Sequence, residues 1–114
     1  MIINRNNARH YVWGANCDGW ELLPDPTLHV IEERMPSQAS EVRHHHGAAR
    51  QFFYVLNGQL CMEVDGATHV LNASDGIEIP AGAPHRAYNE SGRDVVFLVM
   101  SSPTTRGDRF DHSA

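Results

Sequence analysis

The segment EVRHHHGAARQFFYVLNG, residues 41–58, combines three consecutive histidines with an apolar run that ends at Asn57-Gly58. Short apolar runs closed by turn residues are typical of β-strands, and Asn-Gly is a strong turn dipeptide. The segment therefore predicts two strands, 41–46 and 51–56. The histidines are either ligands of a metal ion or polar residues that line a wet cavity.

Strand geometry separates the three histidines. Residues i and i+2 of a strand face the same side, about 6.6–7 Å apart, so His44 and His46 point together and His45 points away. Two imidazoles at this spacing can converge on one ion, and imidazole is the commonest ligand for Zn, Fe, Ni and Cu. We expect His45 to be solvated or at an interface, with no direct role in the site.

The rest of the chain predicts more strands. The expected ranges are 28–35, 59–64, 67–72, 76–80, 85–89 and 95–100. Turn residues separate them, including Asp65-Gly66, which is a second hairpin signal. Short, regularly spaced strands with little helical periodicity indicate an all-β sandwich or barrel.

The two ends of the chain differ from this middle part. Residues 1–27 mix aromatic side chains with Gly, Asn and Asp. We expect an irregular arm there, with room for a short strand, that packs over the barrel 28–102 or over a partner subunit. Within the arm, CDGW (17–20) is either a lid over the pocket or a turn with a packed tryptophan. The polar tail 103–114 is expected to fray.

Composition limits the function classes. The chain has 114 residues, a net charge of -5 and 41% hydrophobic residues, which is ordinary for one globular domain. Its basic residues are all arginine and form no basic stripe, which argues against a nucleic-acid partner. Because no apolar run has the length of a signal-peptide core or a membrane span, we expect a cytoplasmic protein with no membrane partner. In that compartment Cys17 and Cys61 are expected to be free thiols.

Two segments resemble the two sequence motifs of the cupin superfamily. HHHGAARQFFYVLNG matches the first motif at His44, His46, Gln51 and Gly58, with Gln51 where the family usually has Glu. SDGIEIPAGAPHRAYN matches the second motif at Pro80, Gly82, His85 and Asn89, with Ser74 in place of the usual Gly. The resemblance implies a single-domain cupin with an all-β double-stranded β-helix, or jelly-roll barrel. It further implies a homodimer, because small cupins of this type commonly form one.

The resemblance also implies a site for one divalent metal ion, which would be Zn, Ni, Fe, Mn or Co. The implied ligands are His44, His46, Gln51 and His85. The neutral amide of Gln51 in place of a carboxylate leaves the site one charge more positive, which increases Lewis acidity and favours an anionic ligand. Alternatively, Gln51 hydrogen-bonds a metal-bound water or a ligand histidine.

The same glutamine bears on the reaction class. Gln at this position is similar to that of non-redox cupins, such as those that open unsaturated uronates or cyclise polyketides, whereas oxygenase members more often keep Glu. We therefore expect Lewis-acid chemistry of isomerase, cyclase or lyase type on a small polar or anionic metabolite. The alternatives are an Fe(II)-dependent dioxygenase and a non-enzymatic module that binds a metal or small molecule. A metal-free epimerase is a weaker option, because such members usually lack the first-motif histidines.

Strand parity places the apolar residues of 51–56. Phe53 and Val55 share the face of Gln51, so they are possible pocket-lining residues. The side chains that point the other way are also apolar, which indicates a second covering layer, either the arm or a dimer partner. These outward residues are Phe52, Tyr54 and Leu56.

A general acid or base is harder to assign from the sequence. Candidates at the barrel mouth are Tyr88, Glu78, Arg86 and a residue of the arm. Parity turns Arg86 and Tyr88 away from His85, and Glu78 between two isoleucines also faces solvent. The remaining histidines, His10, His29, His69 and His112, are expected at the surface.

Overall fold

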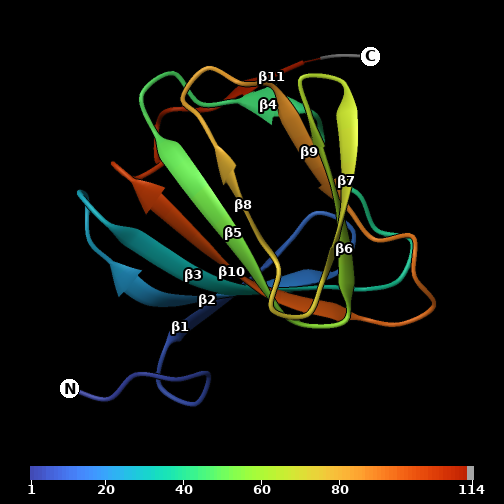
Figure 1. The fold of residues 1–114 in the computed structure, drawn as a ribbon. Helices are drawn as coiled ribbons and strands as arrows, with labels where there is room; N and C mark the ends of the chain where they lie inside the picture. Colours follow the sequence, from blue (N-terminus) through green and yellow to red (C-terminus); the bar gives the residue numbers. More distant parts are fainter. Residues whose placement is uncertain (113–114) are drawn as a thin grey trace.

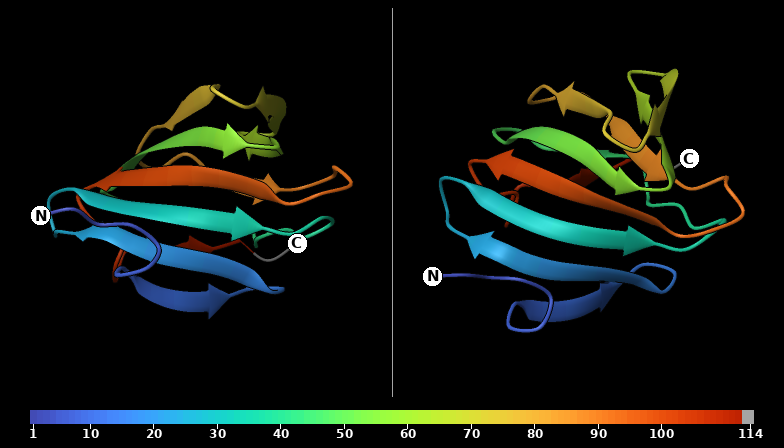
Figure 2. Two further views of the ribbon diagram at one scale, coloured as in Figure 1. Left: turned by 90° about the horizontal axis from the view of Figure 1, so that it is seen from below. Right: turned by 60° about the horizontal axis from the view of Figure 1, so that its bottom comes forward.

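The computed structural model describes residues 1–112 as two antiparallel β-sheets with no helix (Figure 1). The larger sheet has the strand order β1-β2-β3-β10-β5-β8, and Figure 2 shows its long strands lying side by side. The smaller sheet has the order β11-β4-β9-β6-β7. Non-consecutive neighbours such as β3 and β10 show that the chain crosses between the sheets, as in a jelly roll. The predicted fold class is confirmed.

The strand bounds follow the expected pattern in the middle of the chain. The larger sheet contains β1 (Arg9–Trp13), β2 (Cys17–Pro24), β3 (His29–Met35), β10 (Val95–Ser102), β5 (Arg50–Asn57) and β8 (Gly76–Ile79). The smaller sheet contains β11 (Phe110–Asp111), β4 (His44–His45), β9 (His85–Tyr88), β6 (Gln59–Val64) and β7 (Ala67–Asn72). Only β4 is much shorter than expected, because the regular ladder begins at His44; before it, Ser40 forms an isolated bridge with Tyr88, and Glu41 donates its backbone N–H to the carbonyl oxygen of Ala87 (3.0 Å).

The core lies between the inner faces of the two sheets. Along β5, Gln51, Phe53 and Val55 are buried, whereas Phe52 and Leu56 are 40% and 42% exposed. This alternation is the one that strand parity predicted. Side chains such as Phe97 and Val55 are fully enclosed, and each contributes about 1.5–3 kcal/mol through removal of apolar surface from water.

Two turns use glycine for different reasons. At Asp65-Gly66 both residues have positive φ (49° and 85°), and they close the predicted β6–β7 hairpin. Gly58 does not close a hairpin, because β5 and β6 belong to different sheets. Its φ is 89°, and a Cβ there would lie 2.6 Å from the carbonyl oxygen of Asp94, so the chain can cross between the sheets only with glycine.

The N-terminal segment is more regular than expected. Residues 9–24 form a β-hairpin, β1–β2, which extends the larger sheet through pairing of β2 with β3. The segment 17–20 is neither a lid nor a turn, since it lies within β2 and Cys17 is buried in the core. The glycine and asparagine that suggested irregularity belong to the tight turn between the strands, where Gly14 and Asn16 have φ of 53° and 68°.

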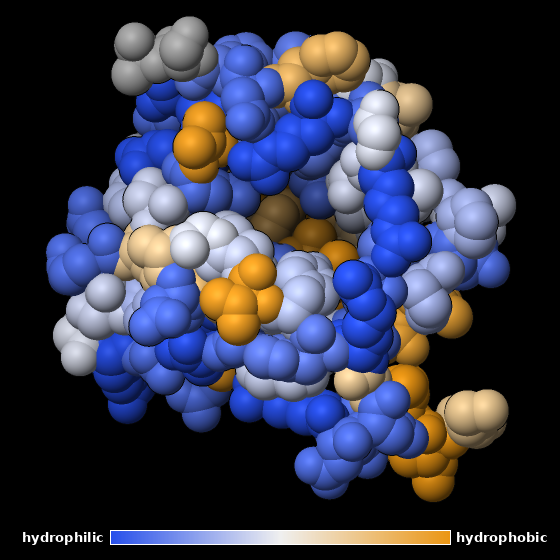
Figure 3. Space-filling model, turned by 180° about the vertical axis from the view of Figure 1, so that it is seen from behind, coloured by the Kyte–Doolittle hydropathy of each residue, from blue (hydrophilic) through white to orange (hydrophobic). Residues whose placement is uncertain are grey.

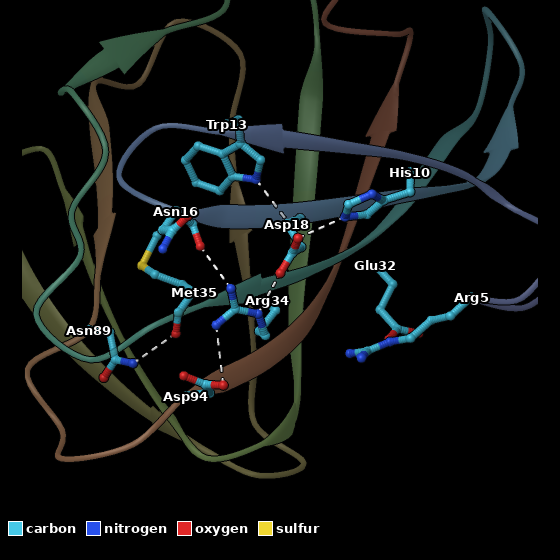
Figure 4. Close-up of polar contacts among 10 residues, drawn as sticks. All are labelled: Arg5, His10, Trp13, Asn16, Asp18, Glu32, Arg34, Met35, Asn89 and Asp94. Carbon is cyan, nitrogen blue, oxygen red and sulfur yellow. Dashed lines mark hydrogen bonds and ion pairs between the residues drawn. The ribbon is translucent and has the colours of Figure 1, made fainter.

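A polar network joins this hairpin to the barrel (Figure 4). Arg34 on β3 donates from Nε to Asp18 (2.5 Å) and from Nη2 to the carbonyl oxygen of Asn16 (2.8 Å). Its Nη1 also pairs with Asp94 (3.2 Å), at the start of β10. The indole N–H of Trp13 donates to the carbonyl oxygen of Asp18 (3.4 Å). Arg34 therefore joins the hairpin, at Asn16 and Asp18, to the segment that precedes β10, at Asp94.

The tail is ordered up to residue 112, contrary to the expectation that it frays. Its strand β11 pairs with β4, and the ring of Phe110 stacks on His45 (4.9 Å between centroids). The carboxylate of Asp108 accepts the backbone N–H groups of residues 47–49 at 2.7–3.0 Å. Residues 113–114 of the predicted tail lie outside the described residues.

Two further predictions can be compared with residues 1–112. Cys17 and Cys61 are free thiols, as predicted, and both are buried. In this part of the chain there is no helix of the length and apolar character needed to cross a bilayer.

Candidate metal centre

Three histidines from two distant segments meet inside the barrel. His44 on β4 pairs directly with His85 on β9, and His46 follows β4. The three side chains are buried, and their ring centroids are 4.4 Å (His44–His85), 4.9 Å (His44–His46) and 5.4 Å (His46–His85) apart. The alternation of the strand thus separates His44 and His46 from His45, as predicted.

Each ring is oriented by one hydrogen bond to the backbone. Nδ1 lies 2.7 Å from the carbonyl oxygen of Val42 for His44, and 2.9 Å from that of Ala83 for His85. For His46 the partner is the carbonyl oxygen of Asp108, at 2.6 Å. Because a carbonyl oxygen can only accept, each Nδ1 carries the proton and each Nε2 keeps a free lone pair. This is the tautomer that a metal-ligating histidine needs.

The free nitrogens converge. One ring nitrogen from each of the three histidines lies within 4.8 Å of the others, close enough to share one ion. Nε2 of His46 and Nε2 of His85 are buried without a hydrogen-bond partner. Buried polar atoms normally have a partner, so orphaned lone pairs that face one another fit a bound cation.

Gln51 brings an oxygen to the same cavity. Its Nε2 donates to Ser101 Oγ (3.2 Å), and its Oε1 is buried without a partner. The amide oxygen is thus in the same unsatisfied condition as the imidazole nitrogens. The residues present fit a three-nitrogen, one-oxygen site for a divalent metal.

Burial keeps the imidazoles neutral. Desolvation lowers the pKa of His44 to about 3 and that of His85 to about 4, with a smaller contribution from the neighbouring rings. Desolvation also lowers the pKa of His46, although its bond to Asp108 opposes the shift. Neutral imidazoles at physiological pH leave the lone pairs available to a metal.

Two of the three histidines, His44 and His46, open onto a cavity of about 230 Å³. Its polar lining consists of Tyr11, Glu33, Glu41, His44, His46, Gln51, Ser101, Thr105 and Arg109, and its apolar lining of Trp13, Ile31, Phe53, Ala87, Phe97 and Val99. Figure 3 shows a hollow with a hydrophobic floor and a largely hydrophilic rim. A cavity of this size accommodates a small metabolite.

Two carboxyl groups in this cavity were missed by the sequence reasoning. Burial, with a smaller contribution from the nearby Glu41, raises the pKa of Glu33 to about 8. Burial also raises the pKa of Glu41 to about 7, against the opposing effect of a hydrogen bond from the Ala87 N–H (2.9 Å). Arg109 lines the same cavity and lowers both pKa values.

The sequence patterns that could have identified Glu33, Glu41 and Arg109 as cavity residues differ. Glu33 shares strand parity with the buried Met35, so alternation in residues 28–35 could have turned it inward. Glu41 has the wrong parity for an inward residue of a 41–46 strand. It lines the cavity nevertheless. Arg109 lies in a tail whose docking the sequence does not indicate.

Of the other candidates, Phe53 lies beside the three histidines, with its ring centroid 6.3 Å from that of His85, and the rest lie away from them. Val55 is fully buried in the core, while Phe53 forms part of the cavity wall. Glu78 is exposed and pairs with Arg50, and Arg86 and Tyr88 lie on the face of β9 opposite to His85. His10 and His69 are exposed.

His29 corrects the surface assignment of the remaining histidines. It is only 4% exposed, because it lies at the start of β3 beneath the tail, and its Nδ1 is 2.9 Å from Thr104 Oγ1. His29 belongs to no sequence motif, but it has the same strand parity as Glu33 and Met35.

Comparison with known proteins identifies the family of the chain. Residues 30–101 match the Cupin domain family, so the chain belongs to the cupins. The solved structure of KdgF from Halomonas superposes with a TM-score of 0.84 and 18% identity, over 94% of this chain and 98% of that one. A sugar phosphate isomerase of the cupin superfamily from Silicibacter pomeroyi gives a TM-score of 0.79 and 21% identity, over 91% and 76%.

Two curated relatives are similar in sequence. An oxidoreductase of Arthrobotrys oligospora is 28% identical over 89 residues, which is 75% of this chain and 35% of the relative. The polyketide synthase CurC of Streptomyces cyaneus is 33% identical over 60 residues, or 53% of this chain and 39% of CurC. The matched part is thus less than half the length of either relative.

Proposed function

We propose that the chain is a metal-dependent cupin enzyme that acts on a small anionic metabolite through isomerase, cyclase or lyase-like chemistry. The proposed ligands of the divalent ion (Zn, Ni, Fe, Mn or Co) are His44, His46, His85 and Gln51. The convergence of the three imidazoles, each fixed with its Nε2 lone pair toward the others, carries this proposal. When bound, the metal would supply Lewis acidity toward a carbonyl or hydroxyl oxygen.

The neutral donor set favours an anion in the cavity. Three neutral imidazoles and one amide do not compensate the charge of a divalent ion, so a carboxylate or enolate oxygen would be attracted. Arg109 adds a second positive charge to the same wall. Its planar guanidinium suits a carboxylate better than a point charge does.

Glu33 and Glu41 are the proposed acid–base pair. Their raised pKa values lie near neutrality, so one carboxyl can hold a proton while the other accepts one from a ligand carbon or hydroxyl. Repulsion between the two groups favours such a state, in which only one of them is charged. Proton abstraction and return within one small cavity is the step shared by isomerases, many lyases and cyclases.

The relatives support this range of reactions without choosing among them. One structural neighbour is named a sugar phosphate isomerase, and one sequence relative is named a polyketide synthase. Dioxygenation is the second candidate, because another relative is named an oxidoreductase and Fe(II) also takes histidine ligands.

Proton exchange in D2O tests the proposal without knowledge of the product. The protein, loaded with Zn, Ni, Mn or Fe in turn, is incubated under nitrogen with a panel of keto acids and sugar acids, and loss of C–H signal is followed by NMR. We expect metal-dependent exchange with at least one compound, reduced by at least about 100-fold in Glu33→Gln. Turnover that requires Fe and consumes oxygen would favour the dioxygenase instead. Saturable binding without any exchange would favour a non-enzymatic module.

A further inference from the structure

A second cavity adjoins the first at the edge of the larger sheet. It has a volume of about 630 Å³, and its lining is Arg9, Tyr11, Glu21, Pro24, His29, Ile31, Thr105 and Arg106. Tyr11, Ile31 and Thr105 also line the cavity of the three histidines. These three residues therefore form a wall common to both cavities.

The charges in the outer cavity are arranged around one buried carboxylate. Glu21 is 7% exposed, and its Oε1 accepts hydrogen bonds from Arg106 Nη2 (2.6 Å) and Arg9 Nη1 (3.0 Å). The side chains of Arg9 and Arg106 are 67% and 61% exposed. Each guanidinium has five N–H donors, so most of them remain available to a further acceptor. Two cations around one anion leave a net positive charge.

His29 supplies a buried donor in the same cavity. The hydroxyl oxygen of Thr104 already accepts the backbone N–H of Arg106 (3.3 Å), and its own hydrogen is free to bond His29 Nδ1 (2.9 Å). When the Thr104 hydroxyl donates in this way, the imidazole proton is on Nε2. This atom is buried without a hydrogen-bond partner, since Glu21 Oε1 is 3.9 Å away. An enclosed N–H beside two arginines lacks only an acceptor.

We propose that the outer cavity is a binding site for an anionic oxygen group, a carboxylate or a phosphate, held by Arg9, Arg106 and the Nε2–H of His29. The anion site itself does not depend on the proposed function. Only the substrate class inferred from it rests on that function. A ligand that binds both cavities would present one oxygen function to the three histidines and a second anionic group to the arginines. The substrate class would then be elongated metabolites with a carboxylate or phosphate at the end remote from the reacting carbon.

The test uses inorganic phosphate and acetate as probes, and metal-free protein, so that it does not depend on catalysis. The ring nitrogen signals of His29 are followed by ¹H–¹⁵N NMR as each anion is added. We expect a saturable shift of the Nε2 signal with at least one of the two anions. The anion that binds more tightly identifies the charged group of the ligand.

Variants connect the shift to the named residues. Arg9→Gln and Arg106→Gln should each weaken anion binding by about fivefold, the loss expected for a partly exposed charge-assisted contact. Glu21→Gln should tighten it, because it removes the competing negative charge. Arg50→Gln, which alters an exposed arginine paired with Glu78 elsewhere, should have no effect. The backbone NMR spectrum of each variant reports whether the fold is intact.

His85→Ala separates this proposal from the metal site. The variant should lose its metal and keep its anion-dependent shift at His29. An anion that binds wild type but neither shifts His29 nor responds to Arg9→Gln and Arg106→Gln would overturn the proposal. The absence of saturable binding of both anions would overturn it as well, and the arginines would then serve only to hold β1 (Arg9) and the tail (Arg106) to Glu21 on β2.

Discussion

The imidazoles of His44 and His85 face each other with centroids 4.4 Å apart, on paired positions of β4 and β9. Two protonated rings at this distance would repel strongly, and burial lowers both pKa values. At physiological pH neither ring therefore takes up a second proton. The same geometry would suit a metal cation shared by the two rings, because each neutral Nε2 can donate its lone pair to the cation.

Removal of one imidazole should therefore remove the metal. In His46→Ala and His85→Ala we expect metal affinity to fall by more than about 100-fold, which exceeds the effect of losing an outer hydrogen-bond partner. Elemental analysis of untagged protein measures retention, and circular dichroism checks that the β-fold persists. His45→Ala and the exposed His69→Ala should keep their metal. Full metal content in His85→Ala would contradict the proposed ligand set.

Gln51→Glu tests whether the amide oxygen binds the metal directly. The variant adds a negative charge where the buried Oε1 lacks a partner, and Ser101 Oγ can donate to the new carboxylate. We expect the divalent ion to bind about tenfold more tightly, since ligand charge tunes affinity. Competition with a chelator measures it. An unchanged dissociation constant would mean that Gln51 contacts a ligand or water rather than the metal.

Asp108 should support the site from the tail. Its carbonyl oxygen orients His46, and its carboxylate holds the backbone of residues 47–49. Asp108→Ala should weaken metal binding by about tenfold through a less well oriented His46. Asp111→Ala, which changes a nearby exposed carboxylate, is the matched control. Equal metal affinity in the two variants would assign Asp108 a purely structural role.

The fold could be predicted from the sequence because its signals are local. Alternation, Asp65-Gly66 and the spacing of His44, His46 and His85 each depend on a few neighbouring residues. Strand parity also gave the correct inward face of β5. The folded strands keep this register, because a one-residue shift would turn every buried side chain toward solvent.

The rest of the site depends on long-range docking that no local pattern encodes. Glu41 lines the cavity although strand parity predicts that it points outward, and Arg109 reaches the cavity because the tail folds back along β4. The β1–β2 hairpin can place Tyr11 at the cavity because Gly19 on β2 has no side chain and leaves room for the Tyr11 ring. A Cβ at Gly19 would lie 2.4 Å from Cζ of Tyr11.

The raised pKa of Glu33 predicts a pH dependence of stability. The folded pKa is about 8 against a usual value of 4.5, so the folded state keeps a proton that the unfolded chain releases between these values. The stability of metal-free protein should therefore decline as pH rises through this window. In Glu33→Gln we expect the decline to be smaller, by about 2 kcal/mol between pH 5 and pH 8 after allowance for partial solvent access. Urea unfolding at a series of pH values measures it, and parallel curves for the two proteins would contradict the prediction.

The outer face of β5 predicts self-association. Phe52 and Leu56 are 40% and 42% exposed in a single chain, and the N-terminal hairpin does not cover them because it extends the sheet beyond β3. We expect sedimentation to show a homodimer at high micromolar concentration, with an interface of about 1,200–2,000 Å² as in stable complexes. Phe52→Asp should shift the protein to monomer, because a charge at the centre of an apolar contact must be desolvated. Val70→Asp, at an equally exposed apolar position on β7, should leave the dimer intact. A monomeric wild-type protein would show that these residues are simply exposed to solvent.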